Sequence, residues 1–203
     1  MRIRGRRTIS PGAASLGLAT LVASLLAGVY PASADDSAGA EDAPPGRIEF
    51  VGRNAFATAN GIFHTWRIVE SRIDPASLEE SWALVEVDLS SVDTGNERRD
   101  AHLRDSDFFE VEAFPTASVR VHTPRPAGQS EAGRPLFVAR FDVDLHGVKK
   151  TLDGELELVG ADPLVFEGWL VIDRVDFGVG APHSRWNPLS IREAIPVRFR
   201  VEP

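Results

Sequence analysis

The side chains that most often carry chemistry are spread along this sequence. The five histidines stand far apart, with no close pair at the spacing of two metal ligands, so we expect no metal site. A nucleophilic site needs a Ser or Cys beside a His and a carboxylate, but the chain has no Cys and neither a Gly-x-Ser-x-Gly nor a His-Glu-x-x-His motif. We therefore expect no catalytic residue and no cofactor. The histidines are His64, His102, His122, His146 and His183.

One charged segment, residues 98–115, brings several of these groups together. His102 stands between Asp100 and Arg104 and could contact the polar head group of a ligand. It could equally hydrogen-bond this segment to the end of a strand, and we favour that second interpretation because buried polar groups usually have a structural partner. Asp100 with a neighbouring arginine is likewise more typical of a structural ion pair than of an acid and a base.

The same segment carries apolar side chains that need a cover. Phe108, Phe109 and Phe114 lie within it, and a freely solvated loop would expose them to water at a cost. The run that begins at Glu97 contains neither Pro nor Gly until Pro115, so we expect one or two short helical turns. The segment is therefore predicted to be a short helical lid that packs on a β-structure.

Most of the remaining sequence alternates with the period of a strand. In residues 137–145 every second side chain is apolar, and the residues between them are mostly charged, as in a half-buried antiparallel strand. His146-Gly147 then forms a turn, and a second amphipathic strand follows. About eight strands are expected in all, with no helix long enough for a crossover. An antiparallel barrel and a two-sheet sandwich both fit.

We predict the barrel: an all-β, eight-stranded antiparallel barrel with a short helical lid between strands. Closure removes exposed strand edges, and eight strands can enclose one small ligand. The inward-facing apolar side chains could either fill a dry core or line a tunnel for a hydrocarbon tail, and their spacing does not decide between the two. These side chains are Phe137, Phe141, Leu145, Phe166 and Leu170.

The first residues have the features of an export signal. Four arginines precede an apolar run, and Ala32-Ser33-Ala34 fits a cleavage site, so residues 1–34 are predicted to be a signal peptide for a periplasmic or secreted protein. An uncleaved anchor and a twin-arginine signal are the alternatives. Residues 35–46 are acidic and end in Pro-Pro-Gly, which predicts a disordered leader before a domain over residues 47–203.

The charge of the exported chain limits its partners. Loss of the four arginines takes the formal net charge from −8 to −12. Nucleic acids and anionic membrane surfaces should repel such a chain, and we expect no stable membrane insertion after cleavage. Without Cys the domain has no disulfide and must be held by its core alone.

Several motifs resemble the YceI-like proteins of bacteria. They are Ser91-Val92-Asp93-Thr94, the run from Arg99 to Arg104, Asp107-Phe108-Phe109-Glu110-Val111, Phe114-Pro115, the run from Asp144 to Lys150 and the run from Asp173 to Gly178. The resemblance implies a lipocalin-like barrel that holds a polyisoprenoid or another amphiphilic lipid in its interior, and it implies no catalytic activity. The loop at residues 181–188 and the lack of a first-strand His near Asn54 depart from the family pattern and concern the identity of the ligand.

With this resemblance we favour the tunnel over the dry core. The predicted ligand-binding residues are Phe108 and Phe109 of the lid, His102, and the inward-facing Phe137, Phe141, Leu145, Phe166 and Leu170. The expected partner is an isoprenoid or fatty-acid-like small molecule, and a homodimer stays open beside a monomer. The alternatives are a periplasmic enzyme or redox accessory acting on an isoprenoid or quinone-type substrate, and a protein-interaction module.

Overall fold

The structure is a computed structural model that describes residues 46–203. The predicted signal peptide lies outside the described residues, and so does the predicted leader except for Gly46. Residues Ala40–Pro203 form one compact unit. Within the described part of the chain, no helix is both long and apolar enough to cross a bilayer.

Ten strands form one antiparallel sheet. They are β1 (Gly46–Arg53), β2 (Thr58–Phe63), β3 (Trp66–Arg72), β4 (Trp82–Asp88), β5 (Val92–Asp93), β6 (Thr116–Gln129), β7 (Pro135–Leu145), β8 (Val148–Ala161), β9 (Leu164–Asp173) and β10 (Ala194–Val201). The helix α1 (Glu97–Arg104) lies between β5 and β6 in the sequence, and three short 3-10 helices complete the fold: η1 (Leu78–Glu80), η2 (Leu89–Ser91) and η3 (Val175–Phe177).

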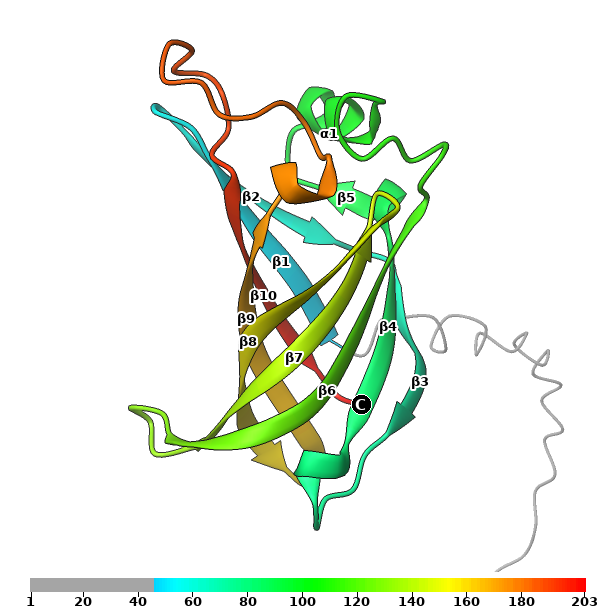
Figure 1. The fold of residues 1–203 in the computed structure, drawn as a ribbon, viewed down its shortest axis with the longest axis vertical. Helices are drawn as coiled ribbons and strands as arrows, with labels where there is room; N and C mark the ends of the chain where they lie inside the picture. Colours follow the sequence, from blue (N-terminus) through cyan, green and yellow to red (C-terminus); the bar gives the residue numbers. More distant parts are fainter. Residues whose placement is uncertain (1–45) are drawn as a thin grey trace, which may run out of the picture. The chain divides into compact units, whose positions relative to one another are not determined.

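The chain itself joins the two ends of this sheet. The strand order is β3-β4-β6-β7-β8-β9-β10-β1-β2-β5, so β3 and the two-residue β5 are its edges. Only His64 and Thr65 separate β2 from β3, so the two are halves of one bent strand that pairs first with β1 and then with β4 (Figure 1). Counted as one strand, with β5 set aside, they give the predicted eight-stranded antiparallel barrel.

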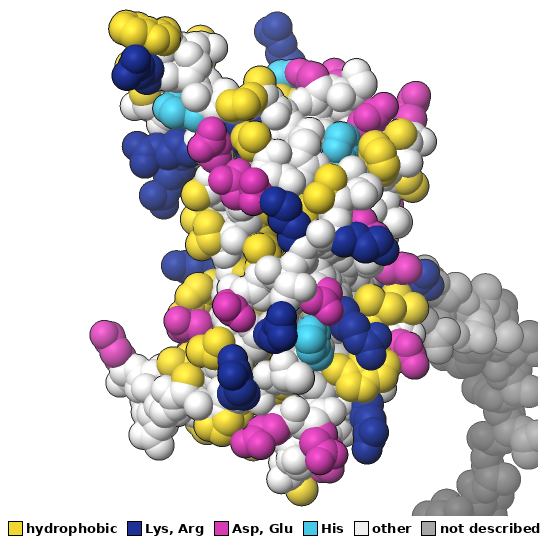
Figure 2. Space-filling view, viewed as in Figure 1, with side chains coloured by type: hydrophobic (Ala, Val, Ile, Leu, Met, Phe, Trp, Pro, Cys, Tyr) yellow, Lys and Arg dark blue, Asp and Glu magenta, His cyan; other side chains and the backbone are white. Residues whose placement is uncertain are grey.

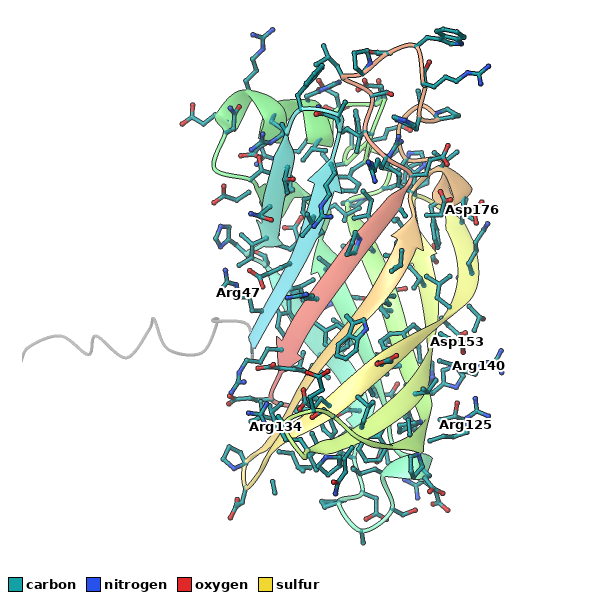
Figure 3. All side chains as sticks on the ribbon, turned by 90° about the vertical axis from the view of Figure 1, so that its left-hand side faces the viewer. Arg47, Arg125, Arg134, Arg140, Asp153 and Asp176 are labelled. Carbon is teal, nitrogen blue, oxygen red and sulfur yellow. The ribbon has the colours of Figure 1, made fainter. Side chains whose placement is uncertain are left out.

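Successive side chains of each strand point alternately into the barrel and out to the surface. On β7 the predicted apolar face is buried throughout, with Phe141 and Ala139 each only 1% exposed. Its partner β8 continues the pattern, since Phe141 is paired with Leu152 and Arg140 with Asp153. Arg140 and Asp153 point outward from the barrel wall in Figure 3. The period-two pattern is thus the reason that this wall is apolar inside and charged outside.

A short helix and the turns after it cover one end of the barrel, called the upper end here as drawn in Figure 1. The side chain of Asn96 accepts a hydrogen bond from the backbone N–H of Arg99 and so caps α1. After Arg104 the chain continues in turns to β6, and Phe108, Phe109 and Val111 pack on the barrel core. The predicted short helical lid is confirmed, and its packing makes it a plug.

The hydrophobic core lies beneath this plug. Leu89, Val143, Leu145, Phe177 and Val179 are all buried there, and they come from three separate parts of the chain: η2, β7, and η3 with the residues just after it. Because the described residues 46–203 contain this core and its hydrogen-bonded sheet, we treat residues 40–203 as a domain that folds alone.

Candidate ligand-binding cavity

The lower part of the barrel is hollow. A cavity of about 150 Å³ lies between the strands, reaching from Val87 near the core to Ile73, Leu78 and Pro203 at the lower end. An engineered protein cavity of about this volume, lined by aliphatic and aromatic groups, stays dry and binds benzene. The volume is therefore sufficient for an apolar group of that size.

Short side chains on one wall leave this space. Among the residues of β4 and β6 that line it are Ala83, Val85, Val119 and Val121, whose short side chains do not reach across the barrel. The upper half instead receives the larger Leu89 and Phe177 with the plug. The barrel is thus filled above and open below.

On the opposite wall a glycine leaves room for an aromatic ring. Phe199 of β10 pairs with Gly168 of β9, and a β-carbon on Gly168 would lie 2.4 Å from the Phe199 ring and 2.5 Å from the carbonyl oxygen of Glu155. Any larger residue at position 168 would therefore push the ring of Phe199, which lines the cavity, toward its centre.

The lining is almost entirely hydrocarbon. Apart from the indole of Trp82, the one polar side chain among the lining residues is Ser81, which is 6% exposed. Its hydroxyl oxygen accepts a hydrogen bond of 2.9 Å from the backbone N–H of Asp74, and so it already has a structural partner. The cavity can hold a hydrocarbon tail, but it offers little to recognise a polar head group inside.

The plug closes the upper end through hydrogen bonds as well as packing. The buried carboxylate of Asp100 accepts hydrogen bonds from the backbone N–H and the hydroxyl of Thr94, just after β5. The guanidinium of Arg104 donates to the carbonyl oxygens of Ser90 and Val92 at 2.8 and 2.9 Å. Both groups satisfy backbone atoms around β5, so their role here is structural.

Four of the eight predicted ligand-binding residues line the cavity: Phe137, Phe141, Phe166 and Leu170. Phe137, Phe141 and Leu170 belong to the core cluster as well, so they form the boundary between the filled and the hollow half.

The other four predicted residues lie above the cavity. Leu145 is buried in the core, and Phe108 and Phe109 pack on it from the plug. His102 is exposed, and its Nε2 lies 2.8 Å from Asp107 Oδ2 within the same segment. The expected hydrogen bond from His102 to a strand end is therefore replaced by a local one, because its ring points along the plug and contacts Phe108 at a centroid distance of 4.9 Å.

Sequence reasoning missed several lining residues. Val119, Val121, Val197 and Phe199 line the cavity, yet the predicted binding residues did not include them. The same period-two signal that found Phe137 and Phe141 marks them. Whether they lie beside a void depends on the size of the side chains across the barrel. Which side chains those are is known only once the pairing of the strands is known.

His64 and His183 contact different partners and do not form one site. His64 lies 2.9 Å from Asp93, and this hydrogen bond is the main cause that lowers the pKa of Asp93. His183 Nδ1 lies 2.9 Å from the hydroxyl oxygen of Ser190, but that hydroxyl donates to a backbone carbonyl oxygen of its own loop, Asn187, at 2.7 Å. In residues 46–203, no group of three or more His, Asp or Glu side chains is arranged to hold a metal ion.

A buried arginine organises the loop that follows η3. Arg174 is 6% exposed and donates hydrogen bonds to the carbonyl oxygens of Val179, Ala181, Ile191 and Arg192. Burial lowers the pKa of its guanidinium from the usual value. Five fixed donors allow one side chain to hold four carbonyls, so Arg174 defines the shape of residues 178–193.

An antiparallel barrel that is plugged at one end and lined by apolar side chains at the other has the architecture of the lipocalin-like binding barrels. A sequence profile of the family described as the YceI-like domain matches residues 42–203, and the chain belongs to this family.

Known proteins resemble this chain at low sequence identity. A UPF0312 protein of Vibrio cholerae is 29% identical over 117 residues, which cover 54% of this chain and 59% of that relative, so the match spans less than two thirds of its length. The crystal structure of Burkholderia cenocepacia BcnA superposes with a TM-score of 0.66 at 20% identity and covers 77% of this chain and 94% of that one. A polyisoprenoid binding domain from Saccharophagus degradans superposes with a TM-score of 0.55 at 22% identity and covers 80% and 97%.

Proposed function

We propose that this protein binds the hydrocarbon tail of an isoprenoid or another amphiphilic lipid in the lower half of its barrel. The observation that carries the proposal is the cavity of about 150 Å³ with an almost wholly apolar lining. One structural neighbour is described as a polyisoprenoid binding domain, which supports the same class of ligand. Burial of the tail contributes about 25 cal/mol per Å² of apolar surface, without any reacting group.

The position of the cavity suggests how such a lipid lies. The plug fills the upper end, so the tail points toward the plug and the head group stays at the lower end, near η1 and the start of β1. In its present shape the cavity takes a group about the size of benzene. A longer tail requires the lining side chains to move outward or part of the tail to stay outside the barrel.

We also propose that the protein acts after export, in the periplasm or outside the cell. The arginine-rich start, the apolar run and the Ala-Ser-Ala site support this location. Detection of a mature chain that begins at Asp35 in the periplasmic or culture fraction would support it, and a full-length chain in the cytoplasm would contradict it.

The binding proposal can be tested with the lipid that co-purifies. Residues 40–203, purified without detergent from bacterial cells, should yield a long-chain amphiphile when organic extracts are analysed by mass spectrometry. Val121→Trp should remove this lipid because the indole fills the cavity, at a cost of about 1–3 kcal/mol for overpacking. If Val121→Trp does not fold, Ala83→Leu fills the same wall with a smaller side chain.

Val138→Trp is the matched control, because Val138 lies on the outer face of β7. It should retain as much lipid as the unchanged domain. Absence of lipid from the unchanged domain, or equal amounts in the Val121→Trp and control proteins, would refute the binding site.

A further inference from the structure

We propose that one corner of the upper end, called the tip, docks on the surface of an anionic phospholipid bilayer. The tip consists of residues 53–58, which form the β1–β2 turn, and residues 181–192, which form most of the loop before β10. The two segments project side by side at the upper left of Figure 1. This surface is separate from the cavity, and the proposal goes beyond lipid binding.

The tip exposes large apolar side chains. Trp186 is 83% exposed, Phe56 75% and Leu189 66%, and these exceed every other exposed large hydrophobic residue in the described part of the chain. Figure 2 shows apolar side chains at this corner, next to basic ones. Isolated exposed hydrophobic residues are ordinary, but three on two adjoining loops mark an interaction surface.

Hydrogen bonds hold the two loops together. The backbone N–H of Ala55 donates to the carbonyl oxygen of Pro188 at 3.1 Å, and that of Arg192 donates to Arg53 at 2.8 Å. The side-chain amide of Asn54 also donates to the carbonyl oxygen of Leu189 at 3.4 Å. With Arg174 fixing the base of the longer loop, the apolar side chains are presented on a shaped surface.

The charge of the tip is opposite to that of the chain. Arg53, Arg185 and Arg192 lie in its two segments, which contain no Asp or Glu, whereas the whole chain has a formal net charge of −8. Within residues 46–203 none of the three forms an ion pair. The Arg185 guanidinium lies 5.0 Å from the centre of the Trp186 ring. The nearest carboxylate in the sequence, Glu193, accepts a hydrogen bond from the backbone N–H of His183.

Exposed Trp, Phe and Leu side chains together with arginines are the composition of protein surfaces that lie in a bilayer interface. The arginines favour anionic head groups. The overall negative charge predicted repulsion from such surfaces, but charges more than about 8 Å from the contact are largely screened at physiological salt. In Figure 2 acidic side chains at this end lie over α1 and also just below the tip, but none belongs to the two tip segments.

Docking by the tip has a consequence for orientation. The hollow half of the barrel is at the opposite end, near η1 and Pro203. The bilayer would therefore hold the protein with the open end of its cavity facing away. Docking then localises the protein, and it should not depend on whether the cavity is filled.

Co-sedimentation with vesicles tests this proposal. Residues 40–203 should sediment with vesicles of equal parts phosphatidylglycerol and phosphatidylethanolamine, more weakly with phosphatidylcholine vesicles, and less as salt is raised. Trp186→Ala should weaken binding at least about tenfold through lost apolar burial, and Arg185→Gln about fivefold through one lost charge.

Matched controls lie on the barrel wall. Trp169 is an exposed tryptophan of β9, and Arg140 is an exposed arginine of β7 that points away from the wall in Figure 3. Trp169→Ala, Arg140→Gln and the cavity-filling Val121→Trp should all bind vesicles like the unchanged domain.

The proposal is overturned if the unchanged domain fails to sediment with anionic vesicles, or if the tip variants and the wall variants bind equally. It is also overturned if sedimentation equilibrium shows a dimer that Trp186→Ala abolishes while vesicles bind nothing, because the tip would then contact a second copy. The Val121→Trp variant distinguishes the two proposals. If it loses the co-purified lipid but still binds vesicles, docking by the tip does not depend on the cavity.

Discussion

The Nε atom of Arg104 donates a hydrogen bond of 2.8 Å to the carbonyl oxygen of Ser90, and this contact joins the plug to the turn after β4. The same guanidinium reaches the carbonyl oxygen of Val92, so one side chain satisfies two backbone acceptors of η2 and β5. The plug is therefore held from the side by hydrogen bonds as well as from below by Phe108 and Phe109.

Arg104→Ala should destabilise the domain by about 2 kcal/mol, because two hydrogen bonds from a charged donor to backbone carbonyl oxygens are lost. Urea unfolding followed by tryptophan fluorescence measures the change. Arg98→Ala, on the exposed side of the same helix, is the control and should change stability by less than about 0.5 kcal/mol. Equal effects of the two variants would mean that the contacts of Arg104 do not hold the plug.

Phe108→Ala and Phe109→Ala should each cost about 2 kcal/mol, since each ring is partly buried on the core and Phe109 lies 6.0 Å from the ring of Phe63. The double variant should also retain less lipid. Stability from urea unfolding and lipid content from mass spectrometry are the two measurements. Phe56→Ala removes an exposed ring and serves as the control. Unchanged stability and unchanged lipid in the double variant would mean that these rings do not close the barrel.

Arg174→Lys should cost about 2–3 kcal/mol although the charge is kept, because one ammonium group cannot reach the four carbonyl oxygens that the guanidinium serves. Hydrogen exchange should become faster in residues 178–193. Arg198→Lys, at an exposed position of β10, should leave both quantities as they are. Slow exchange retained in the loop of Arg174→Lys would show that other contacts define its shape.

Asp142 makes stability depend on pH in the acid range. The hydroxyl of Thr151 donates to its carboxylate at 2.6 Å and His122 lies 3.0 Å from it, and both lower the pKa of Asp142 below its ordinary value of 3.8. A carboxyl with a lowered pKa in the folded state stabilises the protein above the ordinary value and loses that contribution as pH falls through the lowered one. The carboxyl is 48% exposed, so the effect is small.

The comparison of Thr151→Val with the unchanged domain tests this pH dependence. Its urea midpoint should be lower at pH 6, and the difference should shrink as pH falls below 3.8. Thr116→Val, at an exposed position of β6, is the control and should show no such change. A difference between Thr151→Val and the unchanged domain that is constant from pH 6 to the acid limit would contradict the contribution of Asp142.

The sequence predicted the barrel walls well because strand alternation is a local signal. Phe137 to Leu145 alternate as expected, and the motifs around Asp100 and Asp107 marked the plug before any pairing was known. The way in which the barrel closes was not predictable, since it depends on the bend at His64 and Thr65 that divides one strand between two neighbours.

The candidate site was predictable in part. The spacing of the apolar residues predicts which side chains face inward, so Phe141 and Leu170 were correctly placed among the lining residues. Whether an inward-facing side chain meets a void or a packed core depends on the residues across the barrel. Leu145 illustrates this, because it shares the face of Phe141 yet lies in the filled half. The role of Arg174 was not predicted, because the carbonyls that it binds come together only when residues 178–193 fold over it.

The most direct test of the central claim is the mass of the intact domain measured by native mass spectrometry after delipidation and incubation with the C20 isoprenoid alcohol geranylgeraniol. One bound molecule per domain is expected for the unchanged protein and for Val138→Trp, and none for Val121→Trp. Absence of a complex with the unchanged domain, or an equal complex with Val121→Trp, would contradict the claim that the lower half of this barrel holds a lipid tail.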